Sequence, residues 1–263
     1  MINKSHKLYH VYEFFTQSNK DYLSNLAVDN VIFGYHEKEL KVLLIRNPYI
    51  EPWMLPGGYI KKTENVESAA MRVAVQRTGI SSNLFLKQFK IFSEPGRNID
   101  PHITPEALTA LTGIKFDHTH WLFDQIATVG FYTLTEFSKV VINGNTQDEE
   151  TCWWDVNNLP ALLYDHSQII AEALEALRNN IYHFPIGLEL LPEKFTLPEI
   201  RVLYQTILGK EMDDRNFARK LLSQDIIVKL DEVRYTPGHR SPYLYAFNKA
   251  AYKSALSEGI FIT

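Results

Sequence analysis

The chain has 263 residues, of which 45% are hydrophobic and 22% are charged, and its formal net charge is −4. These values are typical of a soluble globular protein with room for two ordinary domains. No stretch is apolar and long enough to span a bilayer, no leader sequence is evident, and a single cysteine excludes an intrachain disulfide, so we expect a cytoplasmic protein.

The charge is unevenly distributed along the chain. Residues 1–185 contain 16 Lys and Arg against 21 Asp and Glu, a balance of −5, whereas residues 186–263 contain 11 against 10, a balance of +1. This contrast is too small to establish nucleic-acid binding, which therefore depends on where the charges lie.

The chain begins with a polar and aromatic arm, residues 1–24. Residues 27–35 and 40–46 are two β-rich runs and predict a hairpin. Asp29 is the only acid in the first run. It is either a hydrogen-bonded polar group at a strand end or a ligand contact at the rim of a cavity, and the sequence leaves both interpretations open.

A glycine turn at residues 53–58 precedes a helix predicted over about 65–78. Apolar residues recur in the i, i+3, i+4, i+7, i+8 pattern of a packed helix face, and Gly79 follows as a C-terminal cap. That apolar face consists of Val66, Ala69, Ala70, Val73 and Ala74.

Positions 73, 76 and 77 share one face of this helix because they are spaced i, i+3, i+4. Three carboxylates there would form an oxygen-rich site for Mg²⁺. The residues present are Val73, Gln76 and Arg77, so the sequence predicts no metal ligands, no cofactor and no metal-assisted phosphoanhydride hydrolysis. A purely structural interpretation is that valine at position 73 improves the packing of the helix.

The whole stretch resembles the Nudix box, written G-x5-E-x7-R-E-U-x-E-E-x-G-U with U a bulky aliphatic residue. The resemblance implies an α/β/α sandwich, and the three missing glutamates imply that the chain has kept the fold and is not an enzyme. The matching residues are Gly58, Glu64, Arg72, Gly79 and Ile80.

Residues 84–92 predict a strand, and the segment 93–120 is irregular with a short helix that begins at Thr104-Pro105 and ends at Gly113. Asp117, His118 and His120 are candidate metal ligands, although a solvated loop is the favoured interpretation. Further strands are predicted at 121–134 and 151–156, and Asp165 begins a helix that runs to about residue 179.

After this first domain, residues 25–180, the segment 181–187 is predicted to be a linker and residues 188–263 a second domain. Helices are expected at 197–208 and 213–223, with Phe217, Leu221 and Leu222 inward. Alternation at 226–230 and 243–247 predicts a β-hairpin. This order of elements is that of a winged helix-turn-helix.

The second helix of this domain would turn polar and basic residues toward solvent, and the hairpin tip adds more. Arginine and lysine suit phosphates and guanine, and asparagine suits adenine. The alternative is a solvated basic face with no DNA. The predicted DNA-binding residues are Arg215, Asn216, Arg219, Lys220, Arg234, His239 and Arg240.

Nearly everything after residue 25 is similar to the Nudix-related transcription regulators, the NrtR-like family that includes arabinose-responsive members. The matching stretches are residues 154–160, 165–166, 185–187, 190–192, 195–197 and 212–217. The resemblance implies a homodimer that binds operator DNA through its winged helix and a small metabolite through its Nudix-like domain.

Known effectors of this family are ADP-ribose-type nucleotides and pentose sugars. Arg77 could neutralise a phosphate, which favours a nucleotide, whereas Asp29 with a stacking Trp53 would suit a sugar. Two rivals remain: a Nudix hydrolase with a metal site drawn from Glu64, Glu67 or Asp124, and a protein-interaction module that binds no DNA. The predicted ligand-binding residues are Asp29, Arg46, Trp53, Gly57, Gly58 and Arg77.

Overall fold

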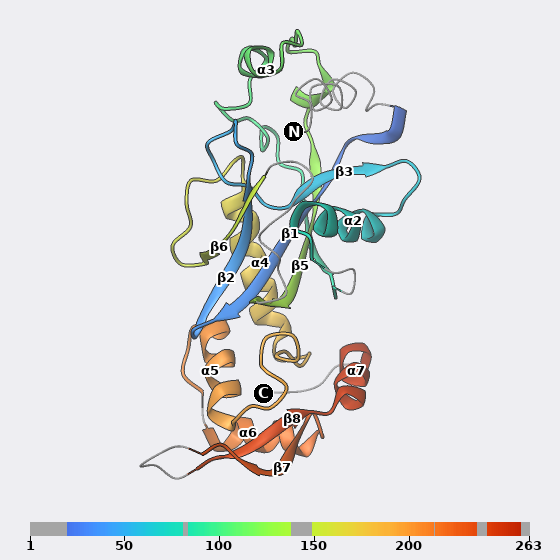
Figure 1. Ribbon diagram of the computed structural model, residues 1–263. Coiled ribbons are helices and arrows are strands. Elements are labelled where there is room, and N and C mark those ends of the chain that lie inside the picture. The colour runs from blue at the N-terminus through green and yellow to red at the C-terminus, as the bar shows by residue number, and fades with distance from the viewer. Residues whose placement is uncertain (1–19, 81–83, 138–148, 213, 236–240, 259–263) are drawn as a thin grey trace, which may run out of the picture. The chain divides into compact units, whose positions relative to one another are not determined.

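The computed structural model describes residues 20–80, 84–137, 149–212, 214–235 and 241–258 (Figure 1). The chain forms two compact units, and each draws on several segments of the sequence. The first consists of Met1–Ile32, Val42–Thr133 and Val140–Ala173. The second consists of Phe33–Lys41, Leu134–Lys139 and Leu174–Thr263. The domain boundaries expected from the sequence stay a prediction.

One sheet of six described strands organises the first unit. Five of its described strands follow the order β4-β5-β1-β2-β6, and β3 pairs with β1 antiparallel, which places Gly57 opposite Asp29 and Gly58 opposite Val28. The strands are β1 (Tyr22–His36), β2 (Glu39–Arg46), β3 (Gly57–Lys61), β4 (Lys87–Phe92), β5 (Ala127–Glu136) and β6 (Glu150–Asp155).

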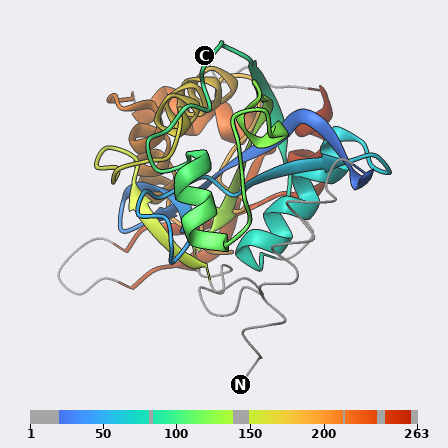
Figure 2. The ribbon, with the colours of Figure 1, turned by 90° about the horizontal axis from the view of Figure 1, so that it is seen from above.

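Helix α2 (Val66–Thr78) covers one face of this sheet, as the apolar pattern predicts. Asn65 caps its first turn and Gly79, with φ 71°, its last. Along β1, Val28 packs against α2 and Asn30 donates to the Ala70 carbonyl, whereas the intervening Asp29 faces His166 at the start of α4 (His166–Asn180). Because side chains alternate along a strand, α2 and the start of α4 lie on opposite faces (Figure 2).

The segment after β4 carries helix α3 (Pro105–Thr112), which lies beyond one end of the sheet (Figures 1 and 2). Its boundaries match the prediction, with Thr104 as N-cap and Gly113 as C-cap. The strand predicted to begin at Trp121 is wrong at its start. Residues Trp121–Phe123 form a 3-10 turn, because the His120 ring accepts the Leu122 amide and packs against Phe116.

The second unit has the predicted winged helix order. Helix α5 (Leu197–Leu208) and helix α6 (Asp214–Ser223) precede the hairpin of β7 (Ile227–Val233) and β8 (Tyr243–Phe247). A C-terminal helix that the sequence reading missed, α7 (Lys249–Glu258), follows and buries Tyr252. Tyr204 of α5 and Phe217 of α6 pack with ring centroids 4.8 Å apart, which fixes the two helices to one core.

The expected inward position of Leu222 was wrong, because its side chain is 37% exposed. In the hairpin, Val228 is 38% exposed. Phe217 and Leu221 are one turn apart and point inward together, so Leu222, one residue further around the helix, faces outward. In β7 the buried residue is Ile227, which places Val228 on the opposite side of the strand.

In the described part of the chain, no helix is long and apolar enough to cross a membrane.

Candidate functional site

The turn before α2 is supported by a partly buried ion pair. Arg72 donates from Nε to both oxygens of Glu64, at 3.1 and 2.9 Å, and from Nη2 to the Tyr59 carbonyl at 2.9 Å. Glu64 also accepts the Lys61 amide at 2.8 Å. The hydrogen bonds from Arg72 and from the Lys61 amide hold the pKa of Glu64 below its ordinary value, against the opposing effect of burial. Both residues therefore brace the turn.

The three positions that would carry glutamates in the Nudix box each have a different use here. Val73 is 2% exposed and belongs to the core cluster, as its apolar character predicts. Gln76 accepts from Arg72 Nη1 at 3.1 Å. The close fit of Gly58 depends on this packing, because a Cβ at position 58 would lie 3.1 Å from Val73 Cγ2.

Arg77 contacts Glu149, a residue that the sequence did not predict to belong to the site. Its Nη2 lies 2.7 Å from Glu149 Oε1 and 3.8 Å from the Met54 sulfur. The Glu149 side chain is 4% exposed and that of Arg77 is 23% exposed. Burial lowers the pKa of Arg77 and raises the pKa of Glu149, while each charge favours the ionised form of the other.

No group of three or more His, Cys, Asp or Glu residues within the described ranges is arranged to hold a metal ion. Asp117 accepts from the Thr119 amide and hydroxyl, and His118 lies 4.0 Å from Glu106, with both side chains of that pair exposed. These loop residues thus form local contacts in solvent.

A buried charged network surrounds Asp29. Arg97, from the irregular segment, binds Asp165 through two parallel bonds of 2.9 and 2.7 Å and donates to the Ile126 carbonyl at 3.1 Å. The same guanidinium lies 3.9 Å from Asp29 Oδ2, and His166 Nε2 lies 3.8 Å from Asp29 Oδ1. Asp29 is 6% exposed, and its carboxylate faces the guanidinium of Arg97 and the imidazole of His166.

Hydrogen bonding fixes the tautomer of His166. Its Nδ1 accepts the Leu55 amide at 3.0 Å, so the neutral ring carries its proton on Nε2, which faces Asp29. Burial lowers the pKa of His166, with the neighbouring carboxylates acting in the opposite direction. Burial also raises the pKa of Tyr59 and of Tyr164, and the negative charge of Asp29 adds to both shifts.

Position 57 lies next to this network and requires glycine for a steric reason. A Cβ at position 57 would lie 2.1 Å from Asp29 Oδ1 and 3.2 Å from the Val28 carbonyl. Since these are fixed neighbours, only glycine fits, and the structure brings Asp29 and Gly57 together as one part of the predicted ligand site.

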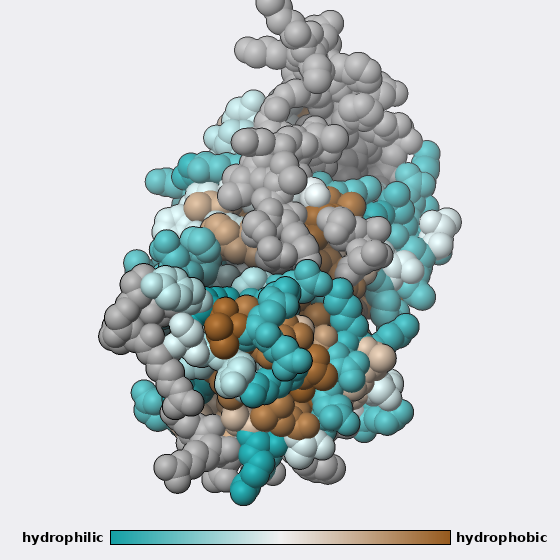
Figure 3. Space-filling view, turned by 60° about the horizontal axis from the view of Figure 1, so that its bottom comes forward, coloured by the Kyte–Doolittle hydropathy of each residue, from teal (hydrophilic) through white to brown (hydrophobic). Residues whose placement is uncertain are grey.

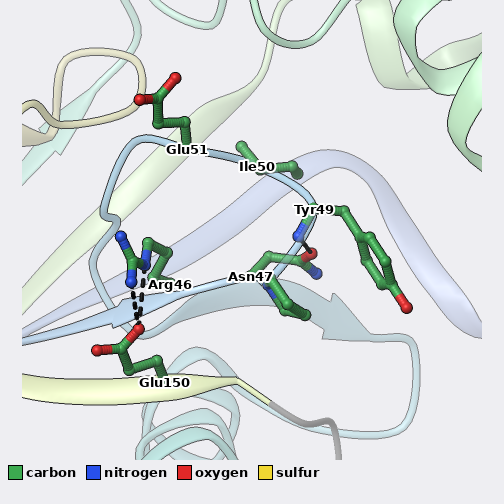
Figure 4. Close-up of a pocket in the computed structure, with 7 residues that line it drawn as sticks. Arg46, Asn47, Tyr49, Ile50, Glu51 and Glu150 are labelled. Atoms are coloured by element: carbon green, nitrogen blue, oxygen red, sulfur yellow. Dashed lines mark hydrogen bonds and ion pairs between the residues drawn. The ribbon is translucent and has the colours of Figure 1, made fainter.

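Arg46 and Trp53 form a second part of the predicted site. The Arg46 guanidinium lies 4.8 Å above the Trp53 ring and pairs with Glu150, and Trp53 packs edge-on against Trp154. A cavity of about 580 Å³ opens beside them (Figure 4). It is lined by Arg46, Asn47, Pro48, Tyr49, Ile50, Glu51 and Glu150.

The sequence could not have shown these groupings, because the partners are far apart along the chain. Arg97 and Asp165 are 68 residues apart, and Arg46 and Glu150 are 104 residues apart. Adjacent residues Glu149 and Glu150 contact different arginines, Arg77 and Arg46.

The candidate DNA surface lies on α6. Phe217 and Leu221 are buried, and Arg219 is exposed on the other side of the helix as predicted. Lys220 is half-buried. Arg215 and Asn216 lie in the helix, but their side chains are outside the described part, as are residues His239 and Arg240.

Arg234, predicted to contact DNA, is bonded to α5 and to the segment before it. Its Nη1 pairs with Glu199, and Nη2 donates to the Lys194 carbonyl at 3.2 Å. Glu199 also accepts the Thr196 amide at 2.7 Å as part of the capping box of α5. Burial opposes ionisation of Glu199, but the bonds from Thr196 and Arg234 outweigh it and lower the pKa.

Hydrophobic side chains gather on one face of the second unit, surrounded by hydrophilic ones (Figure 3). The exposed large hydrophobic side chains in the described part of α6 and the hairpin segment are Leu222, Val228, Val233, Tyr235 and Tyr243. Lys229 Nζ lies 3.4 Å from the centroid of the Tyr243 ring. A basic group thus borders this apolar surface.

Comparison with known proteins connects both units to characterised relatives. Residues 187–247 match the family described as the NrtR DNA-binding winged helix domain. Over 243 residues, 89% of this chain and 87% of the relative, the sequence is 26% identical to the ADPR responsive transcriptional repressor NtrR of Acinetobacter baylyi. Over 150 residues, 56% of this chain and 71% of the relative, it is 25% identical to the ADP-ribose pyrophosphatase of Methanocaldococcus jannaschii.

Solved structures agree with this assignment. Shewanella oneidensis NrtR complexed with a 27mer DNA superposes with a TM-score of 0.66 at 25% identity, covering 87% of this chain and 95% of that one. A MutT/nudix family protein from Enterococcus faecalis has a TM-score of 0.60 at 22% identity over 94% of this chain and 100% of that one, which shows the fold alone. The chain is thus similar over most of its length to Nudix-related transcriptional regulators of the NrtR type, and its residues 187–247 match their DNA-binding winged helix domain.

Proposed function

We propose that this chain binds operator DNA through its winged helix and that an ADP-ribose-like ligand, bound in the Nudix-like unit, changes its DNA affinity. The observation that carries the proposal is the set of contacts made by residues of α2, the helix that corresponds to the Nudix box, and by Glu64 before it. Glu64 and Arg72 brace the turn. In place of metal ligands, Val73 packs in the core, Gln76 accepts a hydrogen bond from Arg72, and Arg77 pairs with Glu149. A scaffold of this kind suits binding without hydrolysis.

An ADP-ribose-like nucleotide is preferred over a pentose as the ligand. The A. baylyi relative is named for its response to ADP-ribose, and the M. jannaschii relative for acting on it. Arg46 stacked on Trp53 offers a flat cationic surface for a base or sugar, and Arg77 a charge for phosphate. The proposed ligand-binding residues remain Asp29, Arg46, Trp53, Gly57, Gly58 and Arg77.

On the DNA side, α6 is the proposed recognition helix, with Arg215, Asn216, Arg219 and Lys220 toward the major groove. A residue exposed beside buried Phe217 and Leu221, as Arg219 is, has the placement that groove contact requires. The proposed active form is a homodimer, because two recognition helices would then reach half-sites about one helical turn, roughly 34 Å, apart.

A gel-shift with the DNA upstream of the chain's own gene tests this function. We expect a retarded complex that ADP-ribose alters and arabinose leaves unchanged. A complex that responds to arabinose alone would move the ligand to the pentose class. The absence of any complex, with or without either ligand, would contradict the regulator assignment.

Hydrolysis is the second candidate function, since one relative is an ADP-ribose pyrophosphatase. The carboxylate of Glu64 is engaged by Arg72 and the Lys61 amide, which leaves it poorly placed to hold a cation. Turnover of ADP-ribose that requires Mg²⁺ and disappears in Glu64→Gln would establish a hydrolase. We expect no turnover in either protein.

A further inference from the structure

The ion pair between Arg77 and Glu149 lies where the Nudix resemblance would place a metal-binding carboxylate. A guanidinium group has five donors in a planar fork that matches the oxygens of a phosphate. In the folded chain, the Arg77 guanidinium contacts the carboxylate oxygen Oε1 of Glu149 at 2.7 Å. With 23% of its side chain exposed, Arg77 can be reached from solvent, whereas Glu149, at 4%, cannot.

Glu149 is poorly stabilised as a buried anion. No hydrogen-bond donor among the described residues reaches its second oxygen, Oε2. A buried carboxylate with one unsatisfied oxygen loses hydration that a single ion pair replaces only in part. Burial accordingly raises the pKa of Glu149. Exchange of this carboxylate for another anion on Arg77 would let Glu149 recover its hydration.

The charges around the pair oppose the binding of a phosphate while Glu149 remains in place. Arg77 interacts electrostatically with Asp29, which in turn lies 3.9 Å from Arg97, itself paired with Asp165. Counting Glu149, three carboxylates surround two guanidinium groups. A phosphate approaching Arg77 would meet an excess of negative charge as long as Glu149 stays in place.

We propose that Glu149 is a resident counter-anion of Arg77 that a phosphate group of the ligand displaces, so that this pair sets the preference for phosphorylated over neutral ligands. The inference rests on the proposed function and adds to it the residue that the ligand replaces. No bond is made or broken in the step, because one oxyanion replaces another on the same guanidinium.

Titration calorimetry on the full chain tests the proposal with three probes: inorganic pyrophosphate, ADP-ribose and arabinose. Glu149→Gln removes the competing charge, and we expect it to bind both phosphate probes about tenfold more tightly than the unmodified chain. Arg77→Gln should lose about tenfold, and Arg77→Lys should lose less. Glu172→Gln is the matched control, because Glu172 pairs with Lys90 at 2.8 Å in the same unit, and it should change nothing.

Equal or weaker phosphate binding by Glu149→Gln would overturn the proposal, as would an equal gain for arabinose. If the unmodified chain releases DNA on addition of ADP-ribose while Glu149→Gln binds ADP-ribose no more tightly, this inference fails and the proposed function stands. If no folded variant binds a phosphate probe, both fail. Circular dichroism of each variant identifies loss of folding, and Glu149→Gln alone decides the result if Arg77→Gln does not fold.

Discussion

Glu64 and Arg72 form a partly buried ion pair that supports the start of the loop before α2. Glu64 accepts from Arg72 and from the Lys61 amide, and Arg72 also reaches the Tyr59 carbonyl. These bonds close the loop between β3 and α2. We expect Glu64→Ala to lower the free energy of unfolding by about 2 kcal/mol, the typical contribution of bonds to a charged group.

The same pair predicts a pH dependence of stability. Because the pKa of Glu64 is lowered in the folded chain, its contribution is fully present above the ordinary value of 4.5 and is lost as pH falls through the lower folded value. Urea denaturation from pH 3 to pH 7 should show a flatter acid limb in Glu64→Gln. Identical limbs in the two proteins would contradict the ion pair.

Position 73 tests how much the packing of α2 against the core depends on an apolar side chain. Val73 is 2% exposed, so Val73→Glu would bury an unpaired charge and should cost roughly 3 kcal/mol in urea denaturation. Val228→Glu makes the same substitution at a 38% exposed position and should cost less than about 0.5 kcal/mol. Similar losses at both positions would argue against core packing at Val73.

At the scale of elements, we predict that α6 and the hairpin make separable contributions to DNA binding. A side chain that neutralises one phosphate contributes about 0.9 to the slope of log affinity against log salt. Arg219→Ala, on the exposed face of α6, should therefore weaken binding and flatten the slope by about one unit. Unchanged affinity and slope would remove Arg219 from the interface.

Arg234 should behave differently, because Glu199 and the Lys194 carbonyl hold it at the base of the hairpin. If it positions the hairpin, Arg234→Ala and Glu199→Gln should both weaken DNA binding, by about threefold to tenfold, or roughly 1 kcal/mol, with the salt slope unchanged. If it contacts phosphate, Glu199→Gln would leave affinity equal or higher and Arg234→Ala would flatten the slope. Fluorescence anisotropy across a salt series separates these outcomes.

The sequence predicted most of these elements because their signals are local. Asn65 and Gly79 mark the ends of α2, and Thr104 and Gly113 those of α3. The errors arose where tertiary contacts decide, as at the turn that His120 caps and at exposed Leu222. The network of Arg97 with Asp165 could not be predicted, because nothing local relates residues from a loop and a helix start.

At the scale of the whole molecule, the two compact units share continuous elements. Strand β1 contains Asp29 in the first unit and Phe33 in the second, and α4 begins at His166 in the first and ends in the second. Within the second unit, Thr206 of α5 donates to the Lys38 carbonyl at 3.2 Å and Arg178 of α4 to the Ile207 carbonyl at 2.8 Å. Strand β1 and helix α4 thus connect residues of the Asp29 network, along the chain, to residues in or next to these elements that contact α5.

Such continuity predicts energetic coupling between ligand and DNA, and coupling is reciprocal. The most direct test measures the dissociation constant for operator DNA with and without saturating ADP-ribose, and that for ADP-ribose with and without DNA. We expect both to change by the same factor, about fivefold or more. Unaltered DNA affinity in the presence of bound ADP-ribose would contradict the account of this chain as a ligand-responsive regulator.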